Sequence, residues 1–258
     1  MALAAENHDL LTPRYVDQLG GLPLAQDPSP GFIWAQVEYA NGMVVEMLEP
    51  DRVDENDFLR RFLDRSGPGP HHLTFKVPNF GTALDAAAAA GYTPVAVNDS
   101  DPEWKEAFLH PKEAAGVVVQ LAESHEHIDH PDPCTAPSRA HLLHVAHAVQ
   151  SLDEGTRLFE GLLGGRRIGE GAGASHRWVD FRWPGPGRMR LLAPTGPGPV
   201  ENWLGSRTGR VHSLAFAVSD PDRFPDAQED GPRWLVEPDA NLGTRLVLVR
   251  DPADLGGS

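Results

Sequence analysis

Residues 67–123 read GPGPHHLTFKVPNFGTALDAAAAAGYTPVAVNDSDPEWKEAFLHPKEAAGVVVQLAE, and this stretch decides the fold. Its first part predicts a strand, because Leu73 and Phe75 alternate with polar residues. The run TALDAAAAA predicts a helix that ends at Gly91. The β-branched run GVVVQL then predicts a buried strand. The order of one strand, one helix and further strands predicts a βαβββ module.

An internal repeat divides the chain into two halves. The predicted helix ends RYVDQLGG and LFEGLLGG stop at Gly21 and Gly165, which are 144 positions apart. The predicted strands VVEMLEP and RMRLLAP stop at Pro50 and Pro194, again 144 positions apart. The strings PHHLTFKV and VHSLAFAV match at an offset of 141. Three landmarks in one order at nearly one offset predict that the halves are duplicates.

The predicted fold class is therefore α+β, with tandem βαβββ modules that form cupped mixed sheets in two duplicated halves. Residues 1–123 form the predicted N-terminal domain of two paired modules. Residues 124–140 are rich in His, Asp and Pro and form the predicted linker. Residues 141–258 form the predicted C-terminal domain, a degenerate copy of the first.

Composition limits the class of protein and of partner. A hydrophobic content of 40% in 258 residues is enough for a sizeable core. No stretch is long and apolar enough for a membrane span, and the single cysteine, Cys134, excludes an internal disulfide. The formal charge of −15 argues against nucleic acid as a partner. We expect a cytoplasmic protein with a small-molecule ligand, and a homodimer is left open.

The strings HHLTFKV and FLHPKEAAGVVVQL, preceded by VVEMLEP and FLRRFLDRSGPG, carry a resemblance to a known family. They resemble the vicinal oxygen chelate superfamily, which includes glyoxalase, bleomycin-resistance and extradiol dioxygenase proteins. Within it they are most similar to methylmalonyl-CoA epimerases. The resemblance covers about residues 14–123 and implies an eight-stranded cup in each half. It also implies a divalent metal ion that inward-facing side chains hold and that substrate oxygens chelate.

The resemblance implies a set of site residues in the first half. His72 matches the metal-binding histidine of the second module, and Glu46 falls where the epimerases have glutamine or glutamate. Gln120 falls where the family usually has a metal-binding glutamate. The implied metal ligands are thus His72, Glu46 and Gln120. Because a glutamine side chain cannot accept a proton, Glu46 is the expected catalytic base.

One histidine of the family pattern is absent from the first half. His144 matches a metal-binding histidine in the second half, and the repeat places its counterpart immediately before Met1. Either the first strand is lost, truncated or displaced, or the reading frame begins too late, and a first sheet that is short by one strand is one expectation. His8 is a poor replacement, because NHDLLTP reads as the start of a helix.

The second half departs further from the family pattern. Arg190 and Ser213 replace two of the implied ligands, and Val247 or Leu248 replaces the third. Since arginine repels a cation, we expect Arg190 to bind an anionic group of the substrate. Trp104 is the other expected substrate-binding residue, in a loop over the mouth of the cup.

The leading hypothesis is an isomerase or lyase that uses iron, zinc, manganese or cobalt. It would act on a small carbonyl or carboxylate compound through a metal-stabilised, enolate-like intermediate. The alternatives are a metal-free binding or resistance protein and an extradiol-type dioxygenase, whose ligand set needs the missing histidine. SHEHIDH at 124–130 resembles a dinuclear metallo-β-lactamase motif, but prolines follow where that family has glycines, so we interpret it as linker.

Overall fold

The computed structural model of the chain describes residues 1–125 and 139–255. The strands of the first half are β1 (Ala2–Ala4), β2 (Leu22–Ser29), β3 (Phe32–Glu38), β4 (Val44–Pro50), β5 (Gly69–Lys76), β6 (Pro94–Asn98), β7 (Trp104–Leu109) and β8 (Val118–Ser124). Those of the second half are β9 (His141–Val149), β10 (Arg166–Ala172), β11 (His176–Arg182), β12 (Arg188–Pro194), β13 (Gly209–Ala217), β14 (Gln228–Asp230), β15 (Arg233–Val236) and β16 (Leu246–Val249).

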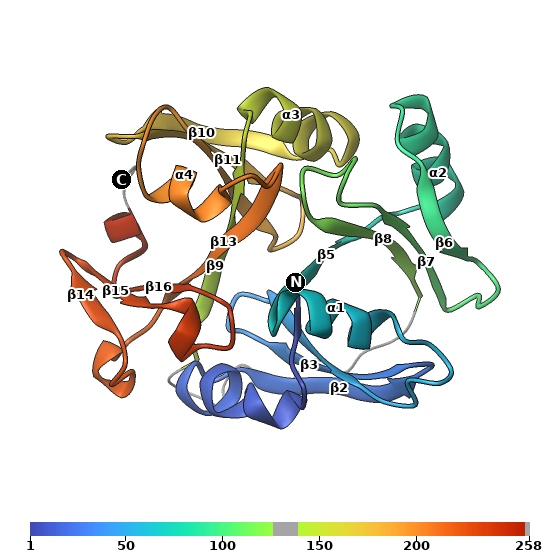
Figure 1. The fold of residues 1–258 in the computed structure, drawn as a ribbon, viewed down its shortest axis with the longest axis horizontal. Helices are drawn as coiled ribbons and strands as arrows, with labels where there is room; N and C mark the ends of the chain where they lie inside the picture. The colour runs from blue at the N-terminus through green and yellow to red at the C-terminus, as the bar shows by residue number, and fades with distance from the viewer. Residues whose placement is uncertain (126–138, 256–258) are drawn as a thin grey trace. The chain divides into compact units, whose positions relative to one another are not determined.

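These strands form two eight-stranded mixed sheets. The first has the order β2-β3-β4-β1-β5-β8-β7-β6, and the second has the order β10-β11-β12-β9-β13-β16-β15-β14 (Figure 1). Adding eight to each strand number of the first order gives the second. The predicted fold class and the duplication of the halves are confirmed.

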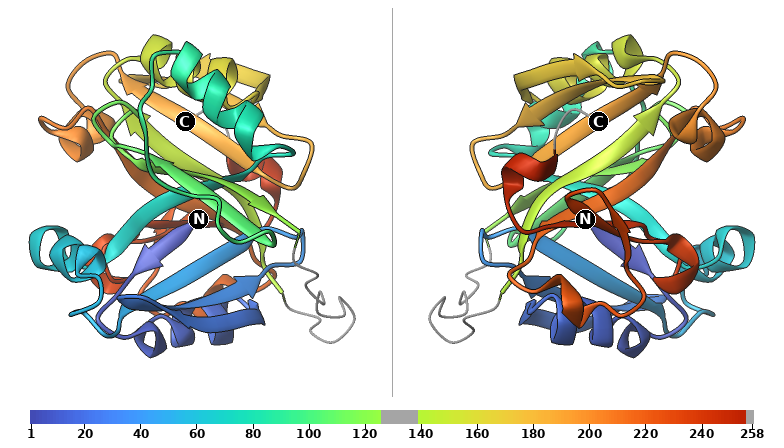
Figure 2. Two further views of the ribbon diagram at one scale, coloured as in Figure 1. Left: turned by 90° about the vertical axis from the view of Figure 1, so that its right-hand side faces the viewer. Right: turned by 90° about the vertical axis from the view of Figure 1, so that its left-hand side faces the viewer.

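The helices are few and short. They are η1 (His8–Leu10), η2 (Pro13–Gln18), α1 (Phe58–Ser66), α2 (Phe80–Ala89), α3 (Leu152–Thr156), η4 (Arg157–Leu162), α4 (Pro199–Leu204), η5 (Pro221–Arg223), η6 (Pro238–Ala240) and η7 (Pro252–Leu255). Figure 2 shows α2, the alanine-rich helix, which packs on β7 and β8. The side chain of Asn79 caps α2 by accepting a hydrogen bond from the Thr82 amide at 2.8 Å. No helix in the described ranges is long and apolar enough to cross a membrane.

The expected gap in the first sheet is absent. Ala2 and Ala4 pair in parallel with Glu46 and Leu48, so β1 completes the eight strands, although it is only three residues long. The expectation of a missing strand was wrong, because these small buried residues fit between β4 and the rest of the sheet. His8 begins the short helix η1, as its surrounding sequence predicts.

Contacts divide the chain into two compact units that do not follow the sequence halves. Unit 1 comprises the described parts of residues 1–71, 139–145 and 213–255, and unit 2 comprises those of 72–125 and 146–212. Unit 1 therefore combines most of the first and fourth modules, and unit 2 most of the second and third. The predicted limits of the two domains, residues 123 and 141, coincide with the limits of the sequence repeat. Their use as domain boundaries stays a prediction.

Unit 1 has an apolar core and a buried polar contact between its two modules. One cluster of the core, in which α1 takes part, consists of Ala2, Ala4, Leu48, Leu59 and Leu63, with Phe32, Trp34, Phe58 and Phe62 packed against it. The Asn241 amide donates to the Tyr15 hydroxyl at 3.1 Å, and the Tyr39 hydroxyl donates to the Tyr15 carbonyl at 3.1 Å. Burial raises the pKa of the Tyr15 hydroxyl to about 12, so it stays neutral.

Unit 2 is organised in the same way. One cluster of its core, in which α4 takes part, consists of Ala146, Ala148, Leu192, Val200 and Leu204, with Trp178 and Trp203 packed against it. The fully buried His147 imidazole donates from Nε2 to the Ala115 carbonyl at 2.8 Å. Burial lowers the pKa of His147 to about 4, so its ring is neutral at pH 7.

Candidate functional site

One face of β5, β7 and β8 carries several polar side chains of unit 2. Thr74 lies opposite Gln120, with His72 one pleat earlier on β5. On the other side of β8, Phe108 lies opposite Gln120, and Glu106 is one pleat away. Because side chains alternate between the two faces of a sheet, these residues share one face. We call His72, Thr74, Trp104, Glu106 and Gln120 the polar face.

A chain of hydrogen bonds runs across this face. The Thr74 hydroxyl donates to Gln120 Oε1 at 2.6 Å, and Gln120 Nε2 donates to Glu106 Oε2 at 2.7 Å. The Trp104 indole Nε1 donates to the same Glu106 oxygen at 3.0 Å. Gln120 is only 6% exposed, so both ends of its amide are held in one orientation.

His72 lies beside this chain and is also buried, at 6% exposure. Its ring packs edge-on against Phe108, with the centroids 6.2 Å apart and an interplanar angle of 89°. It is the diagonal neighbour of Gln120 in the β5–β8 register. At the other end of the face, Lys76 Nζ lies 5.8 Å from the centre of the Trp104 ring. The polar face therefore offers an imidazole, an amide and a carboxylate, with the cation of Lys76 at its end.

Glu46 lies on β4, half-buried, between Ala2 and Gln36 in the strand register. It belongs to unit 1, whereas His72 and Gln120 belong to unit 2. The structure thus brings two of the three expected metal ligands onto one face. The role of Glu46 beside them stays a prediction.

Glu106 is a candidate site residue that the sequence analysis missed. Trp104 does not lie in a loop, as expected, but begins strand β7 and pairs with Ser124 of β8. The expected loop was wrong because the segment WKEAFL alternates between the two faces of the sheet, which makes it a strand. The same alternation, had it been recognised, would have placed Glu106 beside Gln120.

The donor chemistry of the polar face suits part of a divalent metal site. An imidazole nitrogen from His72 and an amide oxygen from Gln120 are ligands that such ions accept. Gln120 Oε1 keeps a second lone pair while it accepts the Thr74 hydroxyl. Within the described residues, no group of three or more His, Cys, Asp or Glu side chains is arranged to hold a metal ion. An ion held at the polar face would therefore need a ligand of another kind, such as the amide oxygen of Gln120.

In the second sheet, the corresponding positions carry different chemistry. Arg190 forms a bidentate ion pair with Asp180, at 2.8 and 2.9 Å, and its guanidinium lies 4.5 Å from the centre of the Trp178 ring. Ser213 is buried in β13. The parallel pairing of β13 with β16 makes Val247, rather than its neighbour in the sequence, the counterpart of Gln120. A role for Arg190 in binding a substrate stays a prediction.

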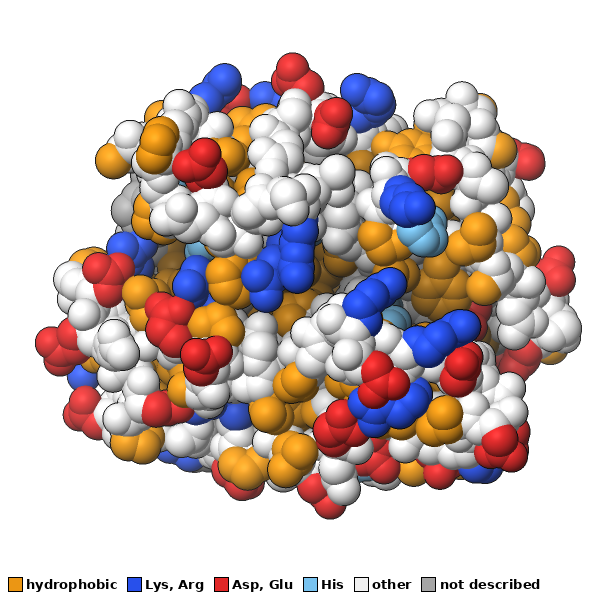
Figure 3. All heavy atoms as spheres, in the orientation of Figure 1, with side chains coloured by type: hydrophobic (Ala, Val, Ile, Leu, Met, Phe, Trp, Pro, Cys, Tyr) orange, Lys and Arg blue, Asp and Glu red, His pale blue; other side chains and the backbone are white. Residues whose placement is uncertain are grey.

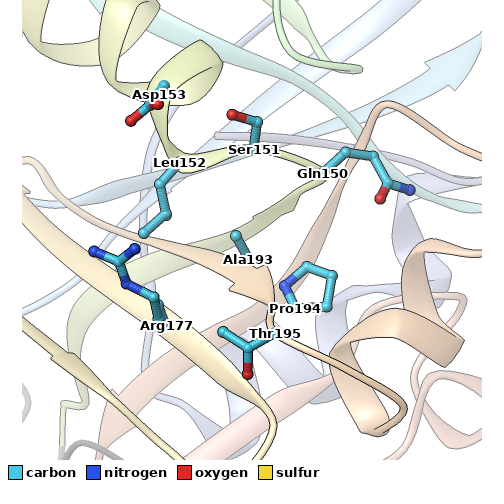
Figure 4. A pocket seen from close by; sticks show the side chains of 8 residues that line it. All are labelled: Gln150, Ser151, Leu152, Asp153, Arg177, Ala193, Pro194 and Thr195. Atoms are coloured by element: carbon cyan, nitrogen blue, oxygen red, sulfur yellow. The ribbon is translucent and has the colours of Figure 1, made fainter.

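A separate shallow pocket of about 210 Å³ lies where β9 leads into α3. Its lining includes Ser151, Asp153, Arg177 and Thr195, and Asp153 and Arg177 lie on opposite sides of it (Figure 4). None of the expected site residues lines this pocket. Most of the histidine-rich string at 124–130 lies outside the described residues, so its interpretation as linker stays a prediction.

Comparisons with known proteins agree on the fold. Residues 1–108 match the family model of the Glyoxalase/Bleomycin resistance protein/Dioxygenase superfamily. A mutant of 4-hydroxymandelate synthase from Streptomyces coelicolor aligns over 96% of this chain and 90% of its own, with a TM-score of 0.66 and 16% identity. At that identity the likeness shows a shared fold.

Other solved structures align with about half of this chain. Methylmalonyl-CoA epimerase from Mycobacterium tuberculosis is 22% identical over 48% of this chain and 85% of its own, with a TM-score of 0.44. A Streptomyces coelicolor methylmalonyl-CoA epimerase is 21% identical over 48% of this chain and 94% of its own, with a TM-score of 0.42. A comparison with curated proteins gave no match.

Proposed function

We propose that this chain is a member of the Glyoxalase/Bleomycin resistance protein/Dioxygenase superfamily, whose family model matches residues 1–108, and that it is an enzyme that acts on a small oxygenated compound at its polar face. The observation that carries this proposal is the partly buried hydrogen-bond chain from Thr74 through the buried Gln120 to Glu106, with the buried His72 beside it. Buried polar groups are costly unless they are paired, so an extended polar network on a sheet face needs a reason beyond packing.

In this proposal His72, Gln120 and Glu46 hold a divalent metal ion such as iron, zinc, manganese or cobalt. The ion, when bound, would polarise a carbonyl or carboxylate oxygen of the substrate as a Lewis acid. The substrate would be a carbonyl or carboxylate compound, and the reaction an isomerisation or a lyase step.

The proposed roles of the other residues follow from their chemistry and contacts. Glu46 is the proposed catalytic base, because Gln120 cannot accept a proton. Glu106 acts as a positioning residue: it accepts the Gln120 amide and so turns the Gln120 carbonyl oxygen toward Thr74 and away from β7. Trp104 holds Glu106 through its indole N–H and offers a ring at the edge of the face for the substrate.

Cobalt(II) titration, followed by visible absorption, tests the metal part of this proposal. We expect saturable binding with d–d bands of a nitrogen- and oxygen-ligated ion, and a loss of affinity of at least about tenfold for His72→Ala. The matched control is His110→Ala, which removes an exposed histidine at the end of β7. Equal loss in the two variants would contradict a site at His72.

A metal-free binding protein is the second candidate, and one observation favours it. Both ends of the Gln120 amide already have partners, which suits a preformed binding surface without an ion. Binding of small carbonyl and carboxylate compounds, measured by calorimetry before and after treatment with a chelator, separates the two candidates. Binding that survives the chelator and the His72→Ala substitution would favour the binding protein.

A further inference from the structure

Three arginines stand in one row across the second sheet. In the strand register Arg166 of β10 lies opposite Arg182 of β11, and Arg182 lies opposite Arg188 of β12. Directly opposite side chains in an antiparallel sheet have their Cβ atoms about 5 Å apart and share one face. We call these three residues the arginine row. Like charges in such positions repel one another, so the row is unfavourable unless something neutralises it.

Two neighbouring arginines, Arg167 of β10 and Arg190 of β12, are neutralised by acidic side chains, but the arginine row is not. Arg167 is paired with Glu160 at 3.1 Å and with Glu170 at 2.8 Å. By contrast, none of the three arginines of the row forms an ion pair with an acidic side chain in the part of the chain that the structure describes. This is notable in a chain of net charge −15, whose acidic side chains are spread over the face shown in Figure 3.

The row is also partly ordered by its surroundings. Arg188 Nη1 donates to the Gly185 carbonyl at 3.1 Å and to the Gly187 carbonyl at 2.8 Å, which holds this guanidinium at the turn between β11 and β12. Arg182 and Arg188 are half-buried. One pleat along the same face, Asp180 is the nearest acid in the register, but both of its oxygens are taken by Arg190. The positive charge of the row is therefore left for a ligand.

We propose that the arginine row binds a soluble small molecule that carries a phosphate group. Guanidinium groups pair with phosphate oxygens through two parallel hydrogen bonds, and three of them suit a dianion better than a single carboxylate. The site is separate from the polar face of the first sheet, and it does not depend on the function proposed there. It would give the second half, which lacks the metal ligands of the family pattern, a binding role of its own.

Calorimetric titration of the full chain with inorganic phosphate and with pyrophosphate tests this proposal. We expect saturable binding at a single site, weakened at least about tenfold by Arg182→Gln, because a bidentate charged hydrogen bond is lost. Arg182→Lys should retain part of the affinity, since it keeps the charge but not the fork. Arg177→Gln is the matched control: it removes the same charge from the same strand on the opposite face and should leave the affinity unchanged.

Further measurements distinguish binding at the arginine row from binding at the polar face, from non-specific attraction and from binding to a lipid surface. His72→Ala should bind phosphate as the native chain does, which separates this site from the one proposed on the polar face. Equal weakening by Arg177→Gln and Arg182→Gln would mean non-specific attraction and would overturn the proposal. Sedimentation with phosphatidic acid vesicles, without binding of free phosphate, would also overturn it in favour of a lipid surface. Circular dichroism of each variant confirms that it is folded.

Discussion

The two sheets share strand order and register, but corresponding faces of β5–β8–β7 and β13–β16–β15 differ in polarity. Four pairs of corresponding residues carry the difference: His72 and Ser213, Thr74 and Ala215, Gln120 and Val247, and Glu106 and Arg233. The second sheet reaches the same architecture with an alanine and a valine where the first has a hydrogen-bonded pair. The polar network of the first sheet is thus not needed to form the fold, and we attribute it to function.

The largest predicted effect concerns the close backbone contacts, which occur in both compact units. A Cβ atom on Gly209, in unit 2, would lie 1.9 Å from the Ala115 carbonyl oxygen, and one on Gly243, in unit 1, would lie 2.0 Å from the Pro68 oxygen. Gly209→Ala and Gly243→Ala should each lower the free energy of unfolding by about 3 kcal/mol or more, because backbone atoms must move apart. Urea unfolding measures this.

Gly161→Ala is the control for both substitutions, because a Cβ there has open space around it. It should leave the free energy of unfolding nearly unchanged. A large loss in only one of the two units would break the comparison, since it would show that the close backbone contacts are not equivalent.

The second prediction concerns acid stability, in which the two halves should differ. His147 is buried with its pKa lowered to about 4, and its counterpart at the offset of 144 is the apolar Leu3. Between pH 6.5 and 4 the unfolded chain takes up a proton that the folded His147 does not. The contribution of His147 to the free energy of unfolding is therefore fully present above pH 6.5. It is lost as the pH falls toward 4, by about 3 kcal/mol at most.

Urea unfolding of native protein and His147→Leu, compared over this pH range, isolates that contribution. The variant loses the hydrogen bond to the Ala115 carbonyl, so its stability should be lower than that of the native protein at pH 7. The difference between native and variant should shrink as the pH falls. A difference that stays constant would contradict the assignment of acid sensitivity to His147.

The third prediction concerns the replacement of one polar-face residue of the first sheet by its counterpart in the second sheet. Gln120→Val introduces the residue found at the corresponding position; it removes the acceptor of the Thr74 hydroxyl and leaves Glu106 with the Trp104 indole as its donor. We expect a loss of about 1–3 kcal/mol in the free energy of unfolding, because buried polar groups lose their hydrogen bonds. Gln36→Val is the control: this half-buried glutamine of β3 has no side-chain hydrogen bond within the described residues. An equal loss in the two variants would argue against a special network.

The smallest predicted effect tests the hydrogen bond that the Trp104 indole donates. Trp104→Phe keeps an aromatic ring but removes the indole N–H that donates to Glu106 at 3.0 Å. The free energy of unfolding should fall by about 1 kcal/mol, and thermal unfolding provides the measurement. Trp234→Phe serves as a control, since this half-buried tryptophan of β15 stacks with Arg250 and its ring is retained.

Much of the fold could be predicted because its signals are local. The alternation in HHLTFKV, the alanine-rich helix and the glycines after helices gave the module, and the constant offset gave the duplication. The grouping of the first module with the fourth could not be predicted, because it depends on contacts such as Tyr15 with Asn241, which are distant in the sequence.

The candidate site was only partly predictable, because strand pairing decides which residues meet. The sequence left Val247 and Leu248 as equal candidates for the counterpart of Gln120, and the β13–β16 register selects Val247. Glu106 was missed because its strand was interpreted as a loop around Trp104. In both cases the residue type was visible, but the partner across the strands was not.

The most direct test of the central claim is the metal content of the purified chain, measured by elemental analysis. The histidines at 125, 127 and 130 are replaced first, so that metal bound by that string does not contribute. We predict about one divalent ion per chain, lost with His72→Ala and retained with His144→Ala, because the ligands lie in the first half. An ion lost with His144→Ala and retained with His72→Ala would place the metal site in the second half and contradict the account.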